Sequence, residues 1–411
     1  MGANPNDISA SKPTYLSRRM QVVRGKTTLY KDICSFEEKA TLVKGTAVSR
    51  PYRSKLVVKT LGADGSYSRQ AVTDTVETLT IDTQKETSLY VTDVDALQSN
   101  YATKNLYAAD AMTAQDEYLD GQVLAESANA GSVVGAYEIA GTGSLADGLG
   151  FTLTTDNIMK MFSKVASKQK KKHVPMKDRW AILSSEAYEV LWQFIAGRES
   201  MLGDKVGQNP NEIGVYHNNR LFVTEGCYWT ANLVVNSTAS DGDTVTINGV
   251  TFTFETSTLD AIGKVKAETS AAVCIDNLVA AINNSEALAA STLGTAYYEL
   301  TAANRLLLDG LVAVDHTTYM TLKGYGVGYV TVAEGLTDVA SVWTAAEQVQ
   351  HILFGQGKPI DLVVQKYPNT KMVPRSGYVG EDLVVWQLFG KKTFKEGADT
   401  MVDVLVRTDA Y

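Results

Sequence analysis

One amphipathic segment, residues 95–129, constrains the fold more than any other part of the sequence. Its apolar residues recur at offsets of four, seven and eleven positions, which is the periodicity of one helix face. Asn129 and Gly131 provide a stop signal. At 1.5 Å per residue, a helix of about 35 residues is about 50 Å long, longer than a small domain is wide. The apolar stripe consists of Leu97, Tyr101, Ala108, Met112, Leu119 and Val123, and the opposite, charged face of Lys104, Asp110, Glu117 and Asp120.

This pattern predicts a rigid strut with one face on protein and the other in water. Thr92 and Asp95 have the spacing of a capping pair at its start. The alternative is two shorter helices broken near Gly121, because glycine inside a helix costs about 1 kcal/mol relative to alanine.

Composition excludes several classes of protein. The chain has 411 residues and a net charge of −8, so no broad basic surface is available for nucleic acid. No apolar run approaches the roughly 18 residues of a membrane span, and no secretory signal peptide is expected. Cys34, Cys227 and Cys274 lack the spacing of a metal site, which predicts buried, reduced thiols. The length predicts two or three domains.

The residues before the strut predict an arm followed by a long hairpin. Residues 1–50 lack a periodic pattern and are locally basic, as in an extended arm, although a disordered terminus explains them nearly as well. Residues 50–90 alternate with a period of two around a turn at Ala63-Asp64-Gly65. The hairpin has few large apolar residues, so we expect it to be stabilised by packing on something else.

The residues after the strut predict a mixed framework interrupted by a small domain. Between 236 and 342, a hairpin turning at Asn248-Gly249, a helix and a second hairpin turning at Asp309-Gly310 are enough for an α+β domain. In the first hairpin, the pattern predicts that Ile247 faces Val250 and that Val245 faces Phe252. The other predicted elements are helices over 154–172, 185–195, 268–283 and 342–354, a hairpin over 215–223 turning at Asn218-Asn219, and strands over 180–183, 305–308, 311–314, 360–365, 376–389 and 400–407.

No catalytic, cofactor-binding or metal-binding motif emerges. The four histidines stand in unrelated contexts, and no nucleophile elbow or phosphate-binding loop is present. Residues 141–146 match a GxGxxA pattern, but Asp147-Gly-Leu-Gly-Phe follows where a nucleotide-binding loop requires a helix. We therefore predict that the protein is not an enzyme and uses no cofactor.

The order of basic arm, extended hairpin, long helix, compact α/β region and long closing strands resembles the major capsid proteins of tailed phages, with the Hong Kong 97-type fold. Three stretches carry the likeness: Leu153-Thr-Thr-Asp-Asn-Ile158 with Arg179-Trp-Ala-Ile-Leu-Ser-Ser185, the hairpin within 211–225, and Ser376-Gly-Tyr through Trp386-Gln-Leu-Phe-Gly390. The likeness covers residues 1–235 and 343–411.

The resemblance implies an α+β capsid fold carrying an inserted small α+β domain. Its parts would be an N-terminal arm (1–50), an extended loop (51–90), a peripheral domain with a spine helix (91–152 and 359–411), an axial domain (153–235 and 343–358) and the inserted domain (236–342). The charged residues of the loop would contact neighbouring subunits, namely Arg50, Arg53, Lys55, Lys59, Asp64 and Arg69. Some relatives join a loop lysine covalently to an asparagine, but no such cross-link is predicted for Lys55 or Lys59.

The implied function is a major capsid protein that self-assembles, as hexamers and pentamers, into the icosahedral shell of a virion. The implied partners are a separate scaffolding protein, a portal and packaged double-stranded DNA that is held without sequence recognition. No membrane partner is expected, and assembly would take place in the host cytoplasm. The alternatives are an encapsulin-like shell subunit and, in a different class, an enzyme with an accessory domain.

Overall fold

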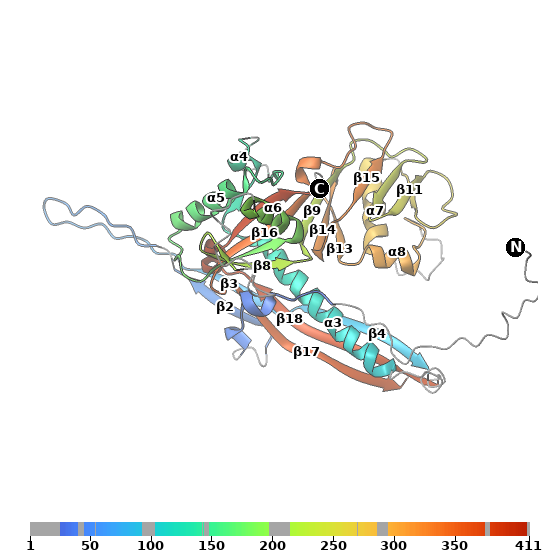
Figure 1. Cartoon of the computed structure of the whole chain (residues 1–411), viewed down its shortest axis with the longest axis horizontal. Coiled ribbons are helices and arrows are strands. Elements are labelled where there is room, and N and C mark those ends of the chain that lie inside the picture. Colours follow the sequence, from blue (N-terminus) through green and yellow to red (C-terminus); the bar gives the residue numbers. More distant parts are fainter. Residues whose placement is uncertain are drawn as a thin grey trace, which may run out of the picture. The chain divides into compact units, whose positions relative to one another are not determined.

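The computed structural model describes residues 25–39, 45–53, 55–92, 103–141, 143, 148–196, 214–268, 270–285, 295–374 and 379–408. The chain divides into two compact units, drawn in Figure 1. The first comprises Met1–Gly25, Gln84–Gln115 and Lys366–Gln387, and the second comprises Lys26–Thr83, Asp116–Gln365 and Leu388–Tyr411.

The first unit contains one half of a long helix and parts of three strands. The elements concerned are α3 (Thr103–Leu124), β4 (Thr83–Thr92), β17 (Ile360–Pro374) and β18 (Gly380–Lys392), and β18 lies between β17 and β4 in the sheet. Gln115 ties the helix to the sheet, because its Nε2 donates to Thr87 Oγ1 at 2.7 Å and its carbonyl accepts from Gln387 Nε2 at 3.0 Å. Within this unit the long helix therefore lies beside β4 and β18.

The helix itself follows the prediction over most of its described length. A 3-10 helix, η3 (Ala125–Asn129), continues α3 and ends where the stop signal was expected. The predicted start at residues 95–102 lies outside the described residues. The alternative of a break near Gly121 is wrong, because α3 passes through it. A Cβ on Gly121 would lie 2.8 Å from the carbonyl oxygen of Tyr325, so the glycine allows a close approach of two backbones.

The expectation that the charged face of this helix is open to water is wrong for Asp120, which is buried. Its Oδ1 accepts backbone N–H groups from Leu29 and Tyr30 at 2.7 and 2.8 Å. Desolvation outweighs these hydrogen bonds and raises the pKa of Asp120 to about 6. One turn before it, Glu117 Oε1 accepts the backbone N–H of Lys26 at 2.7 Å. The acidic face therefore holds residues 26–30 against the helix.

Glu126, in η3, is a second buried carboxylate on this segment. It accepts from Thr393 Oγ1 and Asn129 Nδ2, each at 2.8 Å, and lies 3.2 Å from Lys391 Nζ. Burial alone would raise its pKa, but Lys391 and the two hydrogen bonds lower it. The end of β18 and Thr393, just after it, are thereby tied to the end of the helix.

The second unit is built on a large mixed sheet. Its path runs β13-β14-β9-β16-β6-β8-β7, and β19 pairs with both β16 and β5. The strands are β5 (Val133–Val134), β6 (Arg179–Ser184), β7 (Val215–Tyr216), β8 (Asn219–Thr224), β9 (Cys227–Val234), β13 (Leu311–Asp315), β14 (Tyr319–Val327), β16 (Val349–Gln356) and β19 (Val402–Arg407). The last strand thus pairs on both sides, as its apolar sequence predicts.

Two helices pack on this sheet and enclose one of its hydrophobic cores. They are α5 (Ile158–Lys171) and α6 (Ser185–Ala196), both at predicted positions. Phe162 of α5 is fully buried, and its ring makes edge-on contacts with Phe354 and Tyr216 at 5.4 and 5.0 Å between centroids. The short helices α1 (Tyr30–Ile33), α4 (Ala136–Ile139) and α9 (Lys395–Thr400), the 3-10 helix η2 (Glu37–Lys39) and the strand β1 (Cys34–Ser35) complete this part of the chain.

A separate four-stranded sheet lies within residues 236–342. Its order is β12-β11-β10-β15, with β10 (Thr244–Ile247), β11 (Val250–Glu255), β12 (Lys264–Lys266), β15 (Val332–Gly335) and the helix α7 (Ala271–Asn283). The predicted register is confirmed, since Ile247 pairs with Val250 and Val245 with Phe252, all four buried. Positive φ angles at Asn248 and Gly249 form the predicted two-residue turn.

The same segment also contributes strands to the large sheet. β14 pairs with β9 from Tyr319 to Val327. One hydrophobic core includes Phe252 and Ile275 of the segment together with Trp229 and Leu233 of β9. Residues 236–342 therefore share their core with the framework strand before them.

Two predicted elements have the wrong structure. Residues 302–307 form a helix, α8 (Ala302–Leu307), in place of a strand, because Thr301 Oγ1 caps it by accepting the N–H of Asn304 at 3.2 Å. The helix expected over 342–354 is a short 3-10 helix, η5 (Ala345–Glu347), followed by strand β16. Pairing of β16 with β19, β6 and β9 overrides the helical spacing of its apolar residues.

The turn expected at Asn218-Asn219 lies one residue earlier. The positive φ angles belong to His217 and Asn218, whereas Asn219 already pairs with Tyr216.

Among the described residues, no helix has the length and apolar character needed to cross a membrane. The three cysteines are buried and unpaired, as predicted.

We predict that Gly121→Ala destabilises the protein, although alanine favours helices by about 1 kcal/mol over glycine. The added methyl group would overlap the backbone at Tyr325, and overpacking of this kind costs about 1–3 kcal/mol. Urea unfolding measures the change. The control is Thr113→Ala, at an exposed position of the same helix, where the substitution raises helix propensity and removes a hydrogen bond from the hydroxyl to the carbonyl of Ala109, one turn earlier, at 3.0 Å. Equal or higher stability of Gly121→Ala would contradict the close approach.

We also predict a pH-dependent effect of Asp120→Asn. The folded-state pKa near 6 lies above the ordinary value of 3.8, so the folded state binds this proton more tightly than the unfolded state. Stability contributed by the protonated group is complete below pH 3.8 and is lost as the pH rises through 6. Relative to the wild type, the variant should gain about 2 kcal/mol of unfolding free energy between pH 4 and pH 7. Asp110→Asn, at an exposed position of α3, controls for the lost charge, and a pH-independent difference for Asp120→Asn would refute the assignment.

Candidate intersubunit surface

The extended hairpin has a ladder of backbone hydrogen bonds between paired strands at its base, and its described residues beyond the base form no strand. β2 (Ala47–Tyr52) pairs with β3 (Thr75–Thr80), and the described residues between them contain no further strand. Side chains replace the ladder there, since Gln70 Oε1 accepts the N–H of Val57 at 2.9 Å and Gln70 Nε2 donates to the carbonyl of Lys55 at 3.3 Å. The strands predicted on either side of the turn are thus shorter than expected.

The tip of the hairpin is a defined turn at the predicted position. The N–H of Gly62 donates to the carbonyl of Ser66 at 2.9 Å, and Gly65 has a positive φ of 78°. Asp64 Oδ1 accepts from the hydroxyl and the backbone N–H of Ser66, at 2.6 and 3.1 Å. These hydrogen bonds lower the pKa of Asp64, so its carboxylate is ionised and held at the apex.

Large apolar side chains of this hairpin are exposed to solvent. Val58 is 98% exposed and Tyr67 is 74% exposed. Among the described residues of the hairpin, the large apolar side chains with more than half of their surface exposed are Leu56, Val57, Val58, Leu61, Tyr67, Val72 and Val76. A two-stranded hairpin is marginal in water, and a row of exposed apolar side chains marks a surface that contacts another molecule.

Five of the six charged residues predicted as contacts lie along this hairpin and are exposed. They are Arg53, Lys55, Lys59, Asp64 and Arg69. The structure brings two of them together, because Lys59 Nζ donates to the carbonyl of Arg69 at 3.2 Å. The sequence identified their positions through the period-two pattern and the turn.

Arg50, the sixth, is engaged within its own chain at the base of the hairpin. Its guanidinium lies 2.7 Å from Glu38 Oε1, 3.2 Å from Asp361 Oδ2 and 3.4 Å from Glu396 Oε1. It also stacks on Phe394, 4.2 Å from the ring centroid. Burial raises the pKa of Asp361, and Arg50 offsets part of that rise. Arg50 therefore anchors the hairpin to β17 and to the residues after β18.

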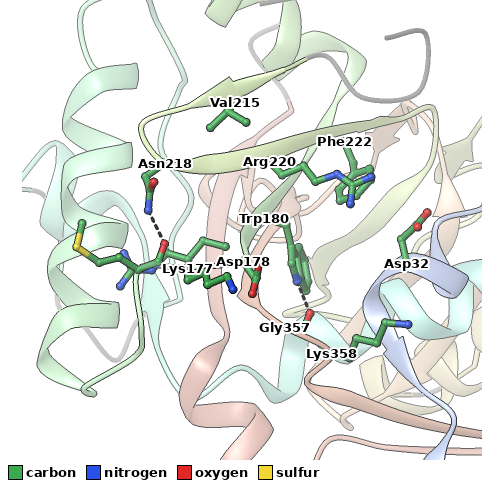
Figure 2. Close-up of a pocket in the computed structure, with 12 residues that line it drawn as sticks. Asp32, Lys177, Asp178, Trp180, Val215, Asn218, Arg220, Phe222, Gly357 and Lys358 are labelled. Atoms are coloured by element: carbon green, nitrogen blue, oxygen red, sulfur yellow. Dashed lines mark hydrogen bonds between the residues drawn. The ribbon is translucent and has the colours of Figure 1, made fainter.

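A cleft of about 540 Å³ lies at the ends of β6, β7 and β8 (Figure 2). One wall is apolar, from Trp180 and Phe222, and Met176 and Val215 stand at the rim with exposed fractions of 67% and 56%. Trp180 is fixed by its Nε1, which donates to the carbonyl of Gly357 at 2.8 Å. The charged lining consists of Lys177, Arg179, Arg220 and Lys358 with Asp32 and Asp178. The sequence did not reveal this cleft, because its lining comes from four separate segments.

A buried polar relay connects three adjacent strands of the large sheet. Thr230 Oγ1 lies 3.1 Å from His351 Nε2, and His351 Nδ1 lies 2.7 Å from Asp403 Oδ2. The spacing resembles that of a nucleophile, base and acid, but the His351 and Asp403 side chains are only 9% and 3% exposed, and Tyr228 covers the imidazole at 4.8 Å. We interpret the relay as structural. Asp403, an acid inside the apolar run of the last strand, was the available signal for it. Among the described residues, no acid, histidine and cysteine cluster could hold a metal.

We predict that Arg50→Ala lowers the free energy of unfolding by about 2 kcal/mol, because the substitution leaves the buried carboxylate of Asp361 without its cation. This magnitude lies between the values typical of exposed and of buried ion pairs. Chemical denaturation measures the loss. Arg53→Ala removes an exposed arginine of the same hairpin and should change stability by less than about 0.5 kcal/mol. Equal effects of the two substitutions would show that Arg50 is not an anchor.

No protein-family model matches this sequence, and no curated protein matches it. Solved structures do match nearly the whole chain. A chain from Mycobacterium phage Che8 is 14% identical with a TM-score of 0.56, and the match covers 98% of each chain. A chain from the asymmetric unit of the bacteriophage PhiM1 mature capsid is 10% identical with a TM-score of 0.51, covering 96% of this chain and 92% of that one. The α+β class is confirmed, and this chain has the fold of these two phage structures, one of which is a mature capsid.

Proposed function

We propose that this protein is the major capsid protein of a tailed phage, a structural subunit without enzymatic activity. The observation that supports this most strongly is the likeness in fold, over nearly all of both chains, to a chain of a mature phage capsid. The exposed apolar hairpin supports it independently, because a side chain such as Val58 at 98% exposure is stabilised only when another molecule covers it.

The proposed assembly is an icosahedral shell of hexamers and pentamers. In this assembly the hairpin, with Arg53, Lys55, Lys59, Asp64 and Arg69 along it, lies on a neighbouring subunit. Overlapping elements of this kind produce large obligate interfaces, on the order of 2,000 Å² or more. Arg50 contributes indirectly, by holding the base of the hairpin.

The proposed domain roles follow the predicted boundaries. The arm (1–50), the extended loop (51–90), the peripheral domain (91–152 and 359–411) and the axial domain (153–235 and 343–358) form the framework, and residues 236–342 form an inserted domain. The four-stranded sheet within 236–342 supports a partly independent insertion, whereas the core shared with β9 indicates that it also stabilises the framework.

The proposed partners are a separate scaffolding protein and a portal during assembly, and packaged double-stranded DNA in the finished virion. The net charge of −8 fits a wall that encloses DNA without binding it tightly, because strong nonspecific binding depends on neutralising many phosphates. Assembly takes place in the host cytoplasm.

An encapsulin-like shell, which encloses protein cargo, is the second candidate, and it uses the same exposed hairpin. Electron microscopy of shells purified from producing cells, with analysis of their contents, separates the two. Double-stranded DNA of uniform length indicates a phage capsid, and a single cargo protein indicates an encapsulin.

The hairpin provides a direct test of shell assembly. Replacing residues 56–72 with a short Gly-Ser turn, in cells that also produce the scaffolding partner, should abolish shells and leave folded subunits. Electron microscopy and sedimentation measure assembly, and thermal unfolding measures folding. The control is Val339→Ser, which changes a side chain that is 90% exposed on another part of the chain and should leave shells intact. Shells from the shortened variant, or only soluble monomers from the wild type under all conditions, would overturn the proposal.

A further inference from the structure

We infer that the cleft at the ends of β6, β7 and β8 is the receptor for the hairpin tip, residues 61–67, of a second copy of this chain. In this contact the Asp64 carboxylate faces Arg220 and Lys177, and the Tyr67 ring covers the apolar wall. The inference rests on the proposed function, since it needs copies that associate.

The size and reach of the two parts are compatible. The cleft of about 540 Å³ falls in the range of roughly 300–1,000 Å³ that receives compact ligands, and the tip is a tight turn closed by the hydrogen bond from Gly62 to Ser66. Asp64 lies twelve residues beyond Tyr52, where the ladder ends, so its maximum reach from that point is about 40 Å at 3.3 Å per residue. In Figure 1 the loop leaves β2 and β3 as a long, narrow projection. A projection of this length can cross to a neighbouring subunit.

The charges are complementary. Asp64 is the only charged residue between 61 and 67, and its carboxylate is ionised and fixed by Ser66. The cleft is lined by four cationic side chains, Lys177, Arg179, Arg220 and Lys358, and by the two carboxylates of Asp32 and Asp178, which gives a net formal charge of +2. Two of these cations also donate to backbone carbonyls of their own chain: Arg179 to Pro175 and Val174, each at 2.8 Å, and Lys358 to Lys31 at 3.5 Å.

The apolar surfaces match as well. Tyr67 and Leu61 are 74% and 63% exposed on the tip, and Met176 and Val215 are 67% and 56% exposed at the rim of the cleft. Figure 2 shows Trp180 in the middle of the lining, with Lys177 and Asp178 to one side of it and Phe222, beside Arg220, to the other. Contact would cover apolar surface on both partners, and an aromatic side chain with a polar end suits such a pocket.

A second cavity, of about 290 Å³, could also receive the hairpin tip, but the net negative charge of its lining disfavours binding of Asp64. Its charged lining is Glu37, Asp361 and Glu396 with Arg50 and Lys358, a net charge of −1. Arg50 is already paired there with Asp361 and Glu396. The ionised Asp64 is therefore attracted to the first cleft and repelled by the second.

Cysteine cross-linking in assembled shells tests the contact. Asp64→Cys is combined with Val215→Cys at the cleft or, as the matched control, with Glu396→Cys, which is 74% exposed at the second cavity. The native cysteines are buried and do not interfere. A disulfide forms only where Cα atoms approach within about 7 Å. The expected result is covalent multimers on non-reducing gels for the 64–215 pair and at least tenfold fewer for the 64–396 pair.

A charge reversal provides an independent measurement. Asp64→Arg and Arg220→Asp should each lower shell yield at least tenfold, and the double variant should restore at least half of it. Thermal unfolding of the subunits shows whether Arg220→Asp folds, and Lys177→Glu takes its place if it does not. Shells that cross-link at 64–396 in preference to 64–215, or a double variant no better than the single ones, would overturn the receptor and leave the capsid function standing. A wild type that forms no shells would overturn the capsid function itself.

Discussion

The larger unit depends on two buried carboxylates near the end of the long helix. Asp120 accepts the backbone N–H groups of Leu29 and Tyr30, and Glu126 binds Lys391 and Thr393. Buried hydrogen bonds thus connect segments that are far apart in the sequence to one helix. Because a buried carboxylate is costly unless it is paired, any displacement of these segments would leave a charge without partners. The close contact of Gly121 with the backbone at Tyr325 fixes the helix from another side.

The hairpin, in contrast, has few buried contacts within its own chain. Its base is anchored by Arg50, whereas its outer part is held by single side chains and presents apolar groups to solvent. A segment that lacks a complete ladder and a core of its own is stabilised when another subunit covers it. The same chain therefore combines a framework that has buried cores with an element that lacks one, and in the proposed assembly a neighbouring subunit would cover that element.

The edge of the large sheet is protected from competing contacts. β13 lies at one end of the sheet, and both backbone groups of Ala313 are bound by the side chain of Asn283, at 2.7 and 2.8 Å. An exposed edge strand would pair with other copies without control of geometry. Its closure by an amide is consistent with association directed through the hairpin and the cleft.

The sequence by itself determined the features that depend on local chemistry. These include the helix that ends at Asn129, the register across Asn248-Gly249 and the turn that carries Asp64, because periodicity and turn residues act over a few positions. The tertiary structure alone decided features that depend on distant partners. Residues 349–356 form a strand because neighbouring strands pair with them. Asp120 is buried where its carboxylate accepts the backbone N–H groups of residues 29 and 30. The cleft lies where four segments of the chain meet. Hydrogen-bond satisfaction and burial are properties of the whole fold, so spacing along the chain could not foretell them.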